Sequence, residues 1–312
     1  MPRALPALAR GLAAVLALSS AHAAAGALRL EDALAAVRFV AYTPRGFDPG
    51  AGGPPPGPDA LRADLALLRP RFDGLVTYSC ANGLDALPRL AREAGFRAVV
   101  LGVWSPGDAA ELGRALDAAR AEPDVVVALA LGNEGLFFHR YDAAALAAAF
   151  ARARRERPGL ALATSEPFSL YLDAARAESL PRQDLLLPNV HPVDQPWFGS
   201  APPQAAVEFV TEVVAELEAR FALPVLVKET GLPSGPREAG FDPAAQAAFW
   251  SALARRLPPT HAHAFAWFEA FDGPWKPARS PDPSPAKRAR EAHWGMFDAQ
   301  GRPKLVLEQL PP

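Results

Sequence analysis

The chain has 312 residues, of which 50% are hydrophobic and 21% are charged, enough for one large α/β barrel or two average domains. Its formal net charge is −2, and a mildly acidic chain lacks the excess of Lys and Arg that binding to nucleic acid requires. Cys80 is the single cysteine, so no internal disulfide can form and the packed core must supply the stability. We expect no nucleic-acid partner.

Residues 1–23 have the composition of a secretory signal peptide. Arg3 and Arg10 make the start basic, residues 11–19 are apolar, and Ala21-His22-Ala23 matches a small-x-small cleavage site. The apolar part is too short to cross a bilayer, and no later apolar stretch approaches that length. Removing these residues takes away two arginines and no acids, which changes the net charge from −2 to −4. We therefore predict a single domain over residues 24–312 that is secreted or periplasmic, without a membrane span.

Short apolar segments of strand length alternate with Ala-, Leu- and Arg-rich segments of helical period. The predicted strands are, in chain order, Val37–Thr43, Gly74–Tyr78, Ala98–Trp104, Asp124–Leu131, Leu160–Thr164, Leu185–His191, Pro224–Lys228 and His263–Phe271. The predicted helices are Asp59–Leu68, Leu84–Ala94, Ala109–Ala121, Ala143–Arg155, Ala205–Phe221 and Pro243–Leu257. Continuous apolar strands that alternate with helices indicate a parallel sheet covered on both faces. Eight strands in this length favour a single (β/α)8 TIM barrel over an open doubly wound sheet.

Two loops interrupt this alternation. Gly46–Pro58 is rich in Gly and Pro, and Trp275–Arg290 contains several prolines and basic residues. Both follow strand ends, so on a barrel they are expected on the active face. The glycines of the first loop do not predict a phosphate site, because the prolines around them supply no N–H and no helix begins directly afterwards.

Two glutamates each follow a short apolar run. Glu134 ends the run of residues 125–134, and Glu229 ends the run of residues 224–229. Barrel enzymes place their catalytic groups at the carboxyl ends of the strands, and cutting a glycosidic bond requires two carboxyl groups. A lone Asn133-Glu134 would be interpreted as a solvated or helix-capping acid, but the apolar strand before it and the second glutamate favour a catalytic site.

The period of two in a strand predicts how the second glutamate is oriented. Val225, Val227 and Glu229 share one face, and Lys228 is expected to point the other way. The alternative is that Glu229 only pairs with Lys228 or with a helix arginine. For cleavage with retention, Glu229 would attack the anomeric carbon as a carboxylate while Glu134 protonates the departing oxygen and then acts as the base. No metal or cofactor is needed.

Four ordered motifs resemble glycoside hydrolase family 17. They are residues 131–134 (LGNE), 228–234 (KETGLPS), 268–276 (FEAFDGPWK) and 291–297 (EAHWGMF). The resemblance extends from about Phe39 to Lys304. It implies a (β/α)8 barrel and the activity of a retaining β-1,3-glucanase or a related glucosyltransferase. By this likeness Glu134 matches the acid/base and Glu229 the nucleophile, while Lys276 and Glu291 match polar residues that support the nucleophile.

Two positions depart from that family. Leu232 stands where tryptophan usually follows Glu-x-Gly, and Gly273 stands where a glutamate commonly follows Phe-Asp. The first change is expected to remove an aromatic contact near the cleft, and the second to remove a carboxylate from the site. Both departures are expected to affect glucan binding and the pH dependence of activity more than the reaction itself.

Aromatic and polar residues at strand ends are candidates for binding sugar. Aromatic rings pack against the apolar face of glucose, although core packing is the alternative for each of them. An acid at a helix N-terminus is the alternative for Glu166, and a buried structural histidine is the alternative for His191. The candidate substrate-binding residues are Tyr42, Tyr78, Asn133, Glu166, His191, Trp197, Trp275, Lys276 and Glu291.

Three functions compete. The first is a hydrolase acting on β-1,3-glucan, and the second is a transglycosylase that forms the same covalent intermediate but uses a sugar acceptor. The third is a glucan-binding barrel without activity, which is disfavoured because both carboxylates are present. His261 and His263 have the spacing of a ligand pair, but they precede the last strand and are expected at the end opposite the active face. The expected partner is a β-glucan chain, and the expected oligomeric state is a monomer.

Overall fold

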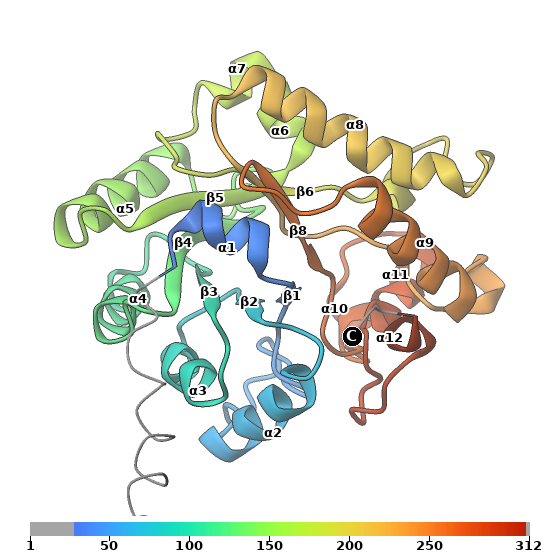
Figure 1. Ribbon diagram of the computed structural model, residues 1–312, viewed down its shortest axis with the longest axis horizontal. Helices are drawn as coiled ribbons and strands as arrows, with labels where there is room; N and C mark the ends of the chain where they lie inside the picture. The colour runs from blue at the N-terminus through green and yellow to red at the C-terminus, as the bar shows by residue number, and fades with distance from the viewer. Residues whose placement is uncertain (1–27, 310–312) are drawn as a thin grey trace, which may run out of the picture.

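The computed structural model describes residues 28–309, and the predicted signal peptide lies outside them. Eight parallel strands form a (β/α)8 TIM barrel (Figure 1), which confirms the predicted fold class. The strands are β1 (Phe39–Ala41), β2 (Gly74–Val76), β3 (Ala98–Val103), β4 (Val126–Asn133), β5 (Ala161–Pro167), β6 (Leu187–Asn189), β7 (Val225–Val227) and β8 (His263–Trp267). Each of the eight predicted segments contains or overlaps one of them.

The hydrogen-bonded order of the strands is β6-β5-β4-β3-β2-β1-β8-β7. Isolated parallel bridges close the ring between β6 and β7, joining Leu186 to Val225 and Asn189 to Glu229. Because all strands are parallel, their carboxyl ends meet at one end of the barrel, where the βα loops leave.

Helices cover the outside of the ring (Figure 1). The α-helices are α1 (Leu30–Ala36), α2 (Pro58–Leu68), α3 (Leu87–Glu93), α4 (Ala109–Ala121), α5 (Ala143–Glu156), α6 (Phe168–Leu172), α7 (Ala174–Ala177), α8 (Gln204–Arg220), α9 (Pro243–Arg256), α10 (Lys276–Arg279), α11 (Pro285–Arg290) and α12 (Leu305–Glu308). The 3-10 helices are η1 (Leu84–Ala86), η2 (Pro192–Asp194), η3 (Arg237–Ala239) and η4 (Glu291–His293). None of the helices within residues 28–309 is long and apolar enough to traverse a bilayer.

Asp side chains begin several of the helices. Asp108 accepts hydrogen bonds from the first turn of α4, Asp142 from that of α5, and Asp242 from that of α9, which also has a proline at its start. These caps satisfy backbone N–H groups that have no partner inside the helix. They account for the starts of α4, α5 and α9, each of which begins at the predicted residue.

The helix α1 was not predicted from the sequence. Its Ala33 and Leu34 are fully buried and belong to a cluster that includes Leu226, Ala264 and Ala266 inside the barrel. Figure 1 shows α1 lying across the ring of strands. Because α1 directly precedes β1, this apolar contact closes the amino end of the barrel.

Candidate active site

The two glutamates lie at the carboxyl end of the barrel, as predicted. Glu134 directly follows β4, and its N–H donates to the carbonyl of Ser165 on β5 at 2.7 Å. Glu229 follows β7 by two residues, and its carbonyl accepts from the N–H of Val190 at 2.7 Å. Both backbones therefore remain paired to the neighbouring strand, which holds the two side chains in place.

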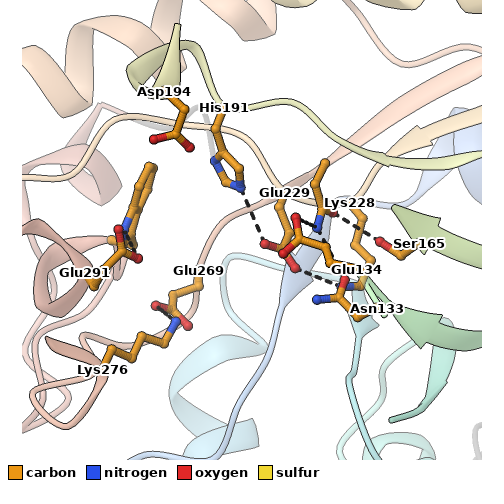
Figure 2. A network of polar contacts seen from close by, with 12 residues as sticks. Asn133, Glu134, Ser165, His191, Asp194, Lys228, Glu229, Glu269, Lys276 and Glu291 are labelled. Atoms are coloured by element: carbon orange, nitrogen blue, oxygen red, sulfur yellow. Dashed lines mark hydrogen bonds and ion pairs between the residues drawn. The ribbon is translucent and has the colours of Figure 1, made fainter. Parts of the chain in front are cut away.

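The chain turns sharply where β4 ends. Glu134 has a φ of 52° and Gly132 a φ of 87°. A Cβ atom at Gly132 would lie 1.8 Å from the Tyr141 hydroxyl oxygen, so only glycine fits beneath this ring. Figure 2 shows Glu134 and Glu229 in the same polar network, and the charge of Glu229 acts on the Glu134 carboxyl.

Lys228 is the nearest cation to Glu229. Its Nζ donates to Glu229 Oε1 at 2.9 Å and to Asn133 Oδ1 at 2.7 Å (Figure 2), and it lies 3.8 Å from the centre of the Tyr78 ring. The Lys228 side chain is completely buried. A buried ammonium requires such partners, because its desolvation is costly unless it is paired and hydrogen-bonded.

This position corrects the prediction that Lys228 points away from Glu229. Leu226 belongs to the interior cluster of the barrel, whereas Val225 and Val227 pack in the outer core. Alternation therefore places Lys228 inside the ring. Glu229 lies beyond the last residue of β7, where strand alternation no longer determines the direction of a side chain.

His191 contacts the other oxygen of Glu229. The imidazole Nε2 lies 3.5 Å from Glu229 Oε2. The ring is held edge-on between Phe268 and Trp294, with centroid distances of 5.5 and 5.3 Å. His191 follows β6 at the carboxyl end of the barrel, and its contact with Glu229 adds to the sugar-binding role expected from the sequence.

Asn189 connects the two glutamates and was not predicted. Its Nδ2 donates to Glu134 Oε1 at 3.0 Å and to Asn133 Oδ1 at 3.3 Å. Since Asn133 also accepts from Lys228, a continuous chain of hydrogen bonds runs from Glu134 to Glu229. The sequence signal that could have identified Asn189 is its place as the last residue of β6, because β4 likewise ends in an amide residue, Asn133.

The surroundings shift the two carboxyl groups in opposite directions. Burial raises the pKa of Glu134, and the negative charge of Glu229 raises it further. Burial also opposes ionisation of Glu229, but the charge of Lys228 and the hydrogen bond and charge of His191 outweigh it and lower the pKa. Burial would lower the pKa of His191, but the hydrogen bond and charge of Glu229 raise it overall. The site thus favours a neutral Glu134 beside an ionised Glu229.

A second ion pair lies beside this network. Lys276 donates to Glu269, which follows β8 and is 2% exposed (Figure 2). Glu291 accepts from Trp294 Nε1 at 3.2 Å and pairs with Arg290. Within residues 28–309, neither Lys276 nor Glu291 forms a hydrogen bond or ion pair with Glu229. Glu291 reaches the nucleophile only through Trp294 and His191, so the support expected from the family resemblance is indirect.

Two candidate sugar-binding residues are buried and held by protein groups. Tyr42 is 1% exposed, and its hydroxyl donates to Asp64 of α2 at 3.0 Å. This contradicts the prediction of a stacking platform, because a ring packed between the sheet and a helix has no open face. Glu166 is also completely buried and accepts from the N–H groups of Leu136 and Phe137 at 3.0 and 3.2 Å. It holds the loop after β4 from behind, and burial raises its pKa to about 6.

The remaining aromatic candidates are partly exposed. Trp197 packs against Phe209 of α8 with a centroid distance of 5.4 Å, and Trp275 lies 5.9 Å from Lys276 Nζ. Of the two departures from the family pattern, Leu232 is 7% exposed and packs in the outer core. A Cβ atom at Gly273 would lie 3.0 Å from the Lys276 side chain, which therefore occupies the space beside this glycine.

The fold and the site together define a barrel enzyme of the glycoside hydrolase class. Residues 40–295 match the family described as the BtgE/BtgC glycoside hydrolase domain. Because this match covers most of the chain, the protein belongs to that family, and it is a glycoside hydrolase.

Similar proteins agree with this assignment. A glucan 1,3-β-glucosidase of Arthroderma benhamiae is 28% identical over 276 residues, which are 80% of this chain and 86% of the relative. An endo-laminarinase from Formosa has a TM-score of 0.66 at 18% identity and covers 86% of this chain and 85% of its own. A glycoside hydrolase family 17 β-1,3-glucanosyltransferase from Rhizomucor miehei has a TM-score of 0.61 at 20% identity and covers 86% and 95%. At these identities the two structures show a shared fold.

Proposed function

We propose that this protein hydrolyses β-1,3-linked glucan with retention of configuration, with Glu229 as nucleophile and Glu134 as acid/base. The observation that supports this most directly is the unequal environment of the two carboxyl groups, since Lys228 and His191 both contact Glu229 and neither ion pair involves Glu134. The β-1,3 linkage is inferred from the names of the relatives. The motifs shared with glycoside hydrolase family 17 point to the same substrate.

In the first step, the Glu229 carboxylate attacks the anomeric carbon. Oε1 is held by Lys228, so Oε2, beside His191, is the attacking atom in this proposal. The bond between the anomeric carbon and the glycosidic oxygen breaks, and Glu134 transfers its proton to that oxygen. The products are a glycosyl ester on Glu229 and a shortened glucan with a free hydroxyl.

In the second step, Glu134 is a carboxylate and takes a proton from water while the water oxygen attacks the anomeric carbon. Glu229 leaves as a carboxylate. Lys228 stabilises the charge that reappears on Oε1, so its buried ammonium favours breakdown of the ester over its accumulation. The same cation, Lys228, thus keeps Glu229 ionised before the reaction and stabilises its carboxylate again after the ester breaks.

The polar and aromatic residues around this pair are proposed to hold the sugar. Those with access to the cleft in this proposal are Tyr78, Asn133, His191, Trp197, Trp275 and Lys276. We also propose that residues 1–23 direct export, which places the enzyme where extracellular glucan is available.

Product analysis tests this proposal. The protein is incubated with defined β-1,3, β-1,4 and mixed-linkage oligosaccharides, and the products are sized. We expect only shorter chains from β-1,3 substrates and initial products with the β configuration. Chains longer than the substrate would indicate transfer to a sugar acceptor, and cleavage confined to β-1,4 bonds would contradict the linkage assignment.

Replacing the nucleophile tests the residue assignment. Glu229→Ala is expected to lower kcat/KM on the order of 10⁴-fold or more, because no other carboxylate replaces it. Added azide should restore turnover of an activated glycoside and yield the α-glycosyl azide, since azide attacks from the vacated side. Glu291→Ala is the control that removes a nearby carboxylate without contact to Glu229. Full activity of Glu229→Ala would refute the assignment.

A further inference from the structure

Large exposed apolar side chains are concentrated at one place on the active face. Within residues 28–309 they are Trp104, which follows β3, and Phe137 and Phe138, which follow β4, with exposures of 40%, 38% and 51%. Phe137 lies three residues beyond Glu134. Contiguous exposed apolar groups on a soluble protein mark binding surfaces more often than chance.

The loop that presents the two phenylalanines is held rigidly. The buried carboxylate of Glu166 accepts from the N–H of Phe137 at 3.2 Å. Tyr141 packs under the loop so closely that a Cβ atom at Gly135 would lie 1.9 Å from its ring. The Phe137 and Phe138 rings meet edge to face, with centroids 5.1 Å apart at 90°. A surface fixed in this way loses little conformational entropy when a ligand binds.

The tryptophan is less available than its exposure suggests. The guanidinium of Arg140 lies 4.1 Å from the centre of the Trp104 ring and covers one face. The same arginine donates to the carbonyl of Asn133. Trp104 and Arg140 therefore support the base of the loop, and the rings that remain exposed for binding are those of Phe137 and Phe138.

A groove of about 690 Å³ borders this loop. It lies between the loop after β4 and the helices α6 and α7, and its size is within the range of about 300–1,000 Å³ typical of ligand pockets. Phe137 lines it together with the polar residues His139, Asp142, Arg176 and Ser179. Rings beside charged and hydroxyl groups match the alternation of apolar faces and hydroxyl edges in a sugar chain.

We propose that this groove, with the Phe137–Phe138 platform, is a second subsite that binds glucosyl units of the same β-glucan chain away from the bond being cleaved. The inference rests on the proposed function, because it assumes a glucan chain in the active site. Continuity supports it: the loop that begins at Glu134 also forms the wall of the groove. Binding here would add affinity for long chains and little for short ones.

The test compares chain lengths. kcat/KM is measured for Phe137→Ser/Phe138→Ser on a long laminari-oligosaccharide and on the shortest one that the enzyme cleaves. We expect the ratio of long to short to fall about 5- to 10-fold, the effect of losing a stacked ring pair. The matched control is Phe137→Tyr/Phe138→Tyr, which keeps both rings and should keep the ratio. Light scattering of each variant reports its oligomeric state.

Three other outcomes overturn the inference. An unchanged ratio in the serine variant would show that long chains do not use the groove. An equal loss on both substrates would place the effect on the catalytic loop itself. A wild-type dimer that dissociates in the serine variant, with an unchanged ratio, would identify the platform as a contact between copies. Absence of any cleavage of β-1,3 chains by the wild type would instead refute the proposed function.

Discussion

The two ends of the barrel have opposite chemistry. At the amino end, Ala33 and Leu34 of α1 close the ring with apolar contacts. At the carboxyl end, Lys228, Glu229 and Glu269 are buried charged groups in direct ion pairs. Because one end is closed by packing, solvent and substrate can reach the buried charges only from the other end. Stability and chemistry are therefore provided by different residues of the same strands.

Each buried charge at the carboxyl end requires a partner. A buried charge without one costs free energy, and removing a partner leaves an uncompensated ion. Asn133, Asn189 and Lys228, at the ends of β4, β6 and β7, provide these partners. Four predictions test whether the two ends are as separate as this arrangement indicates.

Among these four, the largest expected effect is at Glu134. Glu134→Gln should lower kcat/KM for oligosaccharides by about 10²–10⁴, because the amide cannot protonate a poor leaving group. Activated aryl glycosides, which need no proton, should lose far less in the glycosylation step. Steady-state kinetics on both substrate types checks this. Asn189→Ala, which leaves the acid in place but removes its hydrogen bond, is the milder comparison. Equal losses on both substrates would argue against the acid role.

The next effect concerns the closed end. Leu34→Ala should lower the free energy of unfolding by about 2–5 kcal/mol, because a fully buried leucine leaves a cavity. Chemical denaturation measures it, and kcat of the folded enzyme should not change. Leu30→Ala, at a partly buried position of the same helix, should cost less. A large loss of kcat in Leu34→Ala at a temperature where it is folded would show that the two ends are coupled.

A smaller effect is expected when Lys228 is neutralised. Burial opposes ionisation of Glu229 and Lys228 lowers its pKa, so Lys228→Met should raise that pKa. The same charge also lowers the pKa of Glu134. Both limbs of the pH profile of kcat/KM should therefore move to higher pH, and the enzyme should lose activity first on the acid side. Lys276→Met removes a cation that pairs with Glu269 instead and should shift the acid limb less. An unmoved acid limb in Lys228→Met would contradict the assigned role.

The smallest effect is expected on the outer surface. Arg89 and Glu93 of α3 form an ion pair at 2.6 Å, with side chains that are 43% and 42% exposed. Solvent screens such a pair, so Arg89→Ala should change the free energy of unfolding by less than about 0.5 kcal/mol. Denaturation in low and high salt checks this. A loss as large as that of Leu34→Ala would show that surface charge stabilises this barrel more than its closed end does.

Residues at strand ends show how far sequence reasoning extends to the site. Tyr42 follows β1 by one residue and Tyr78 follows β2 by two, and both were predicted to contact sugar. Tyr42 is instead held by Asp64 of α2, whereas Tyr78 lies under Lys228 in the site. Because Ala41 pairs with Val76, Tyr78 lies one position farther along its strand than Tyr42, and the period of two turns the two rings to opposite faces of the sheet. Which partner each ring meets, Asp64 or Lys228, is decided by the packed structure.

The sequence by itself determined the fold class and the location of Glu134 and Glu229. Apolar runs, helix caps and the period of two are local properties, and parallel strands in a closed ring must end at the same rim. Only the tertiary structure decided which groups surround the two carboxylates. Asn189 and His191 lie at the end of β6 and Lys228 lies just beyond β7, and Glu229 turns toward Lys228 because strand alternation stops where β7 ends. Electrostatic environment depends on distances across the barrel, which no local pattern encodes.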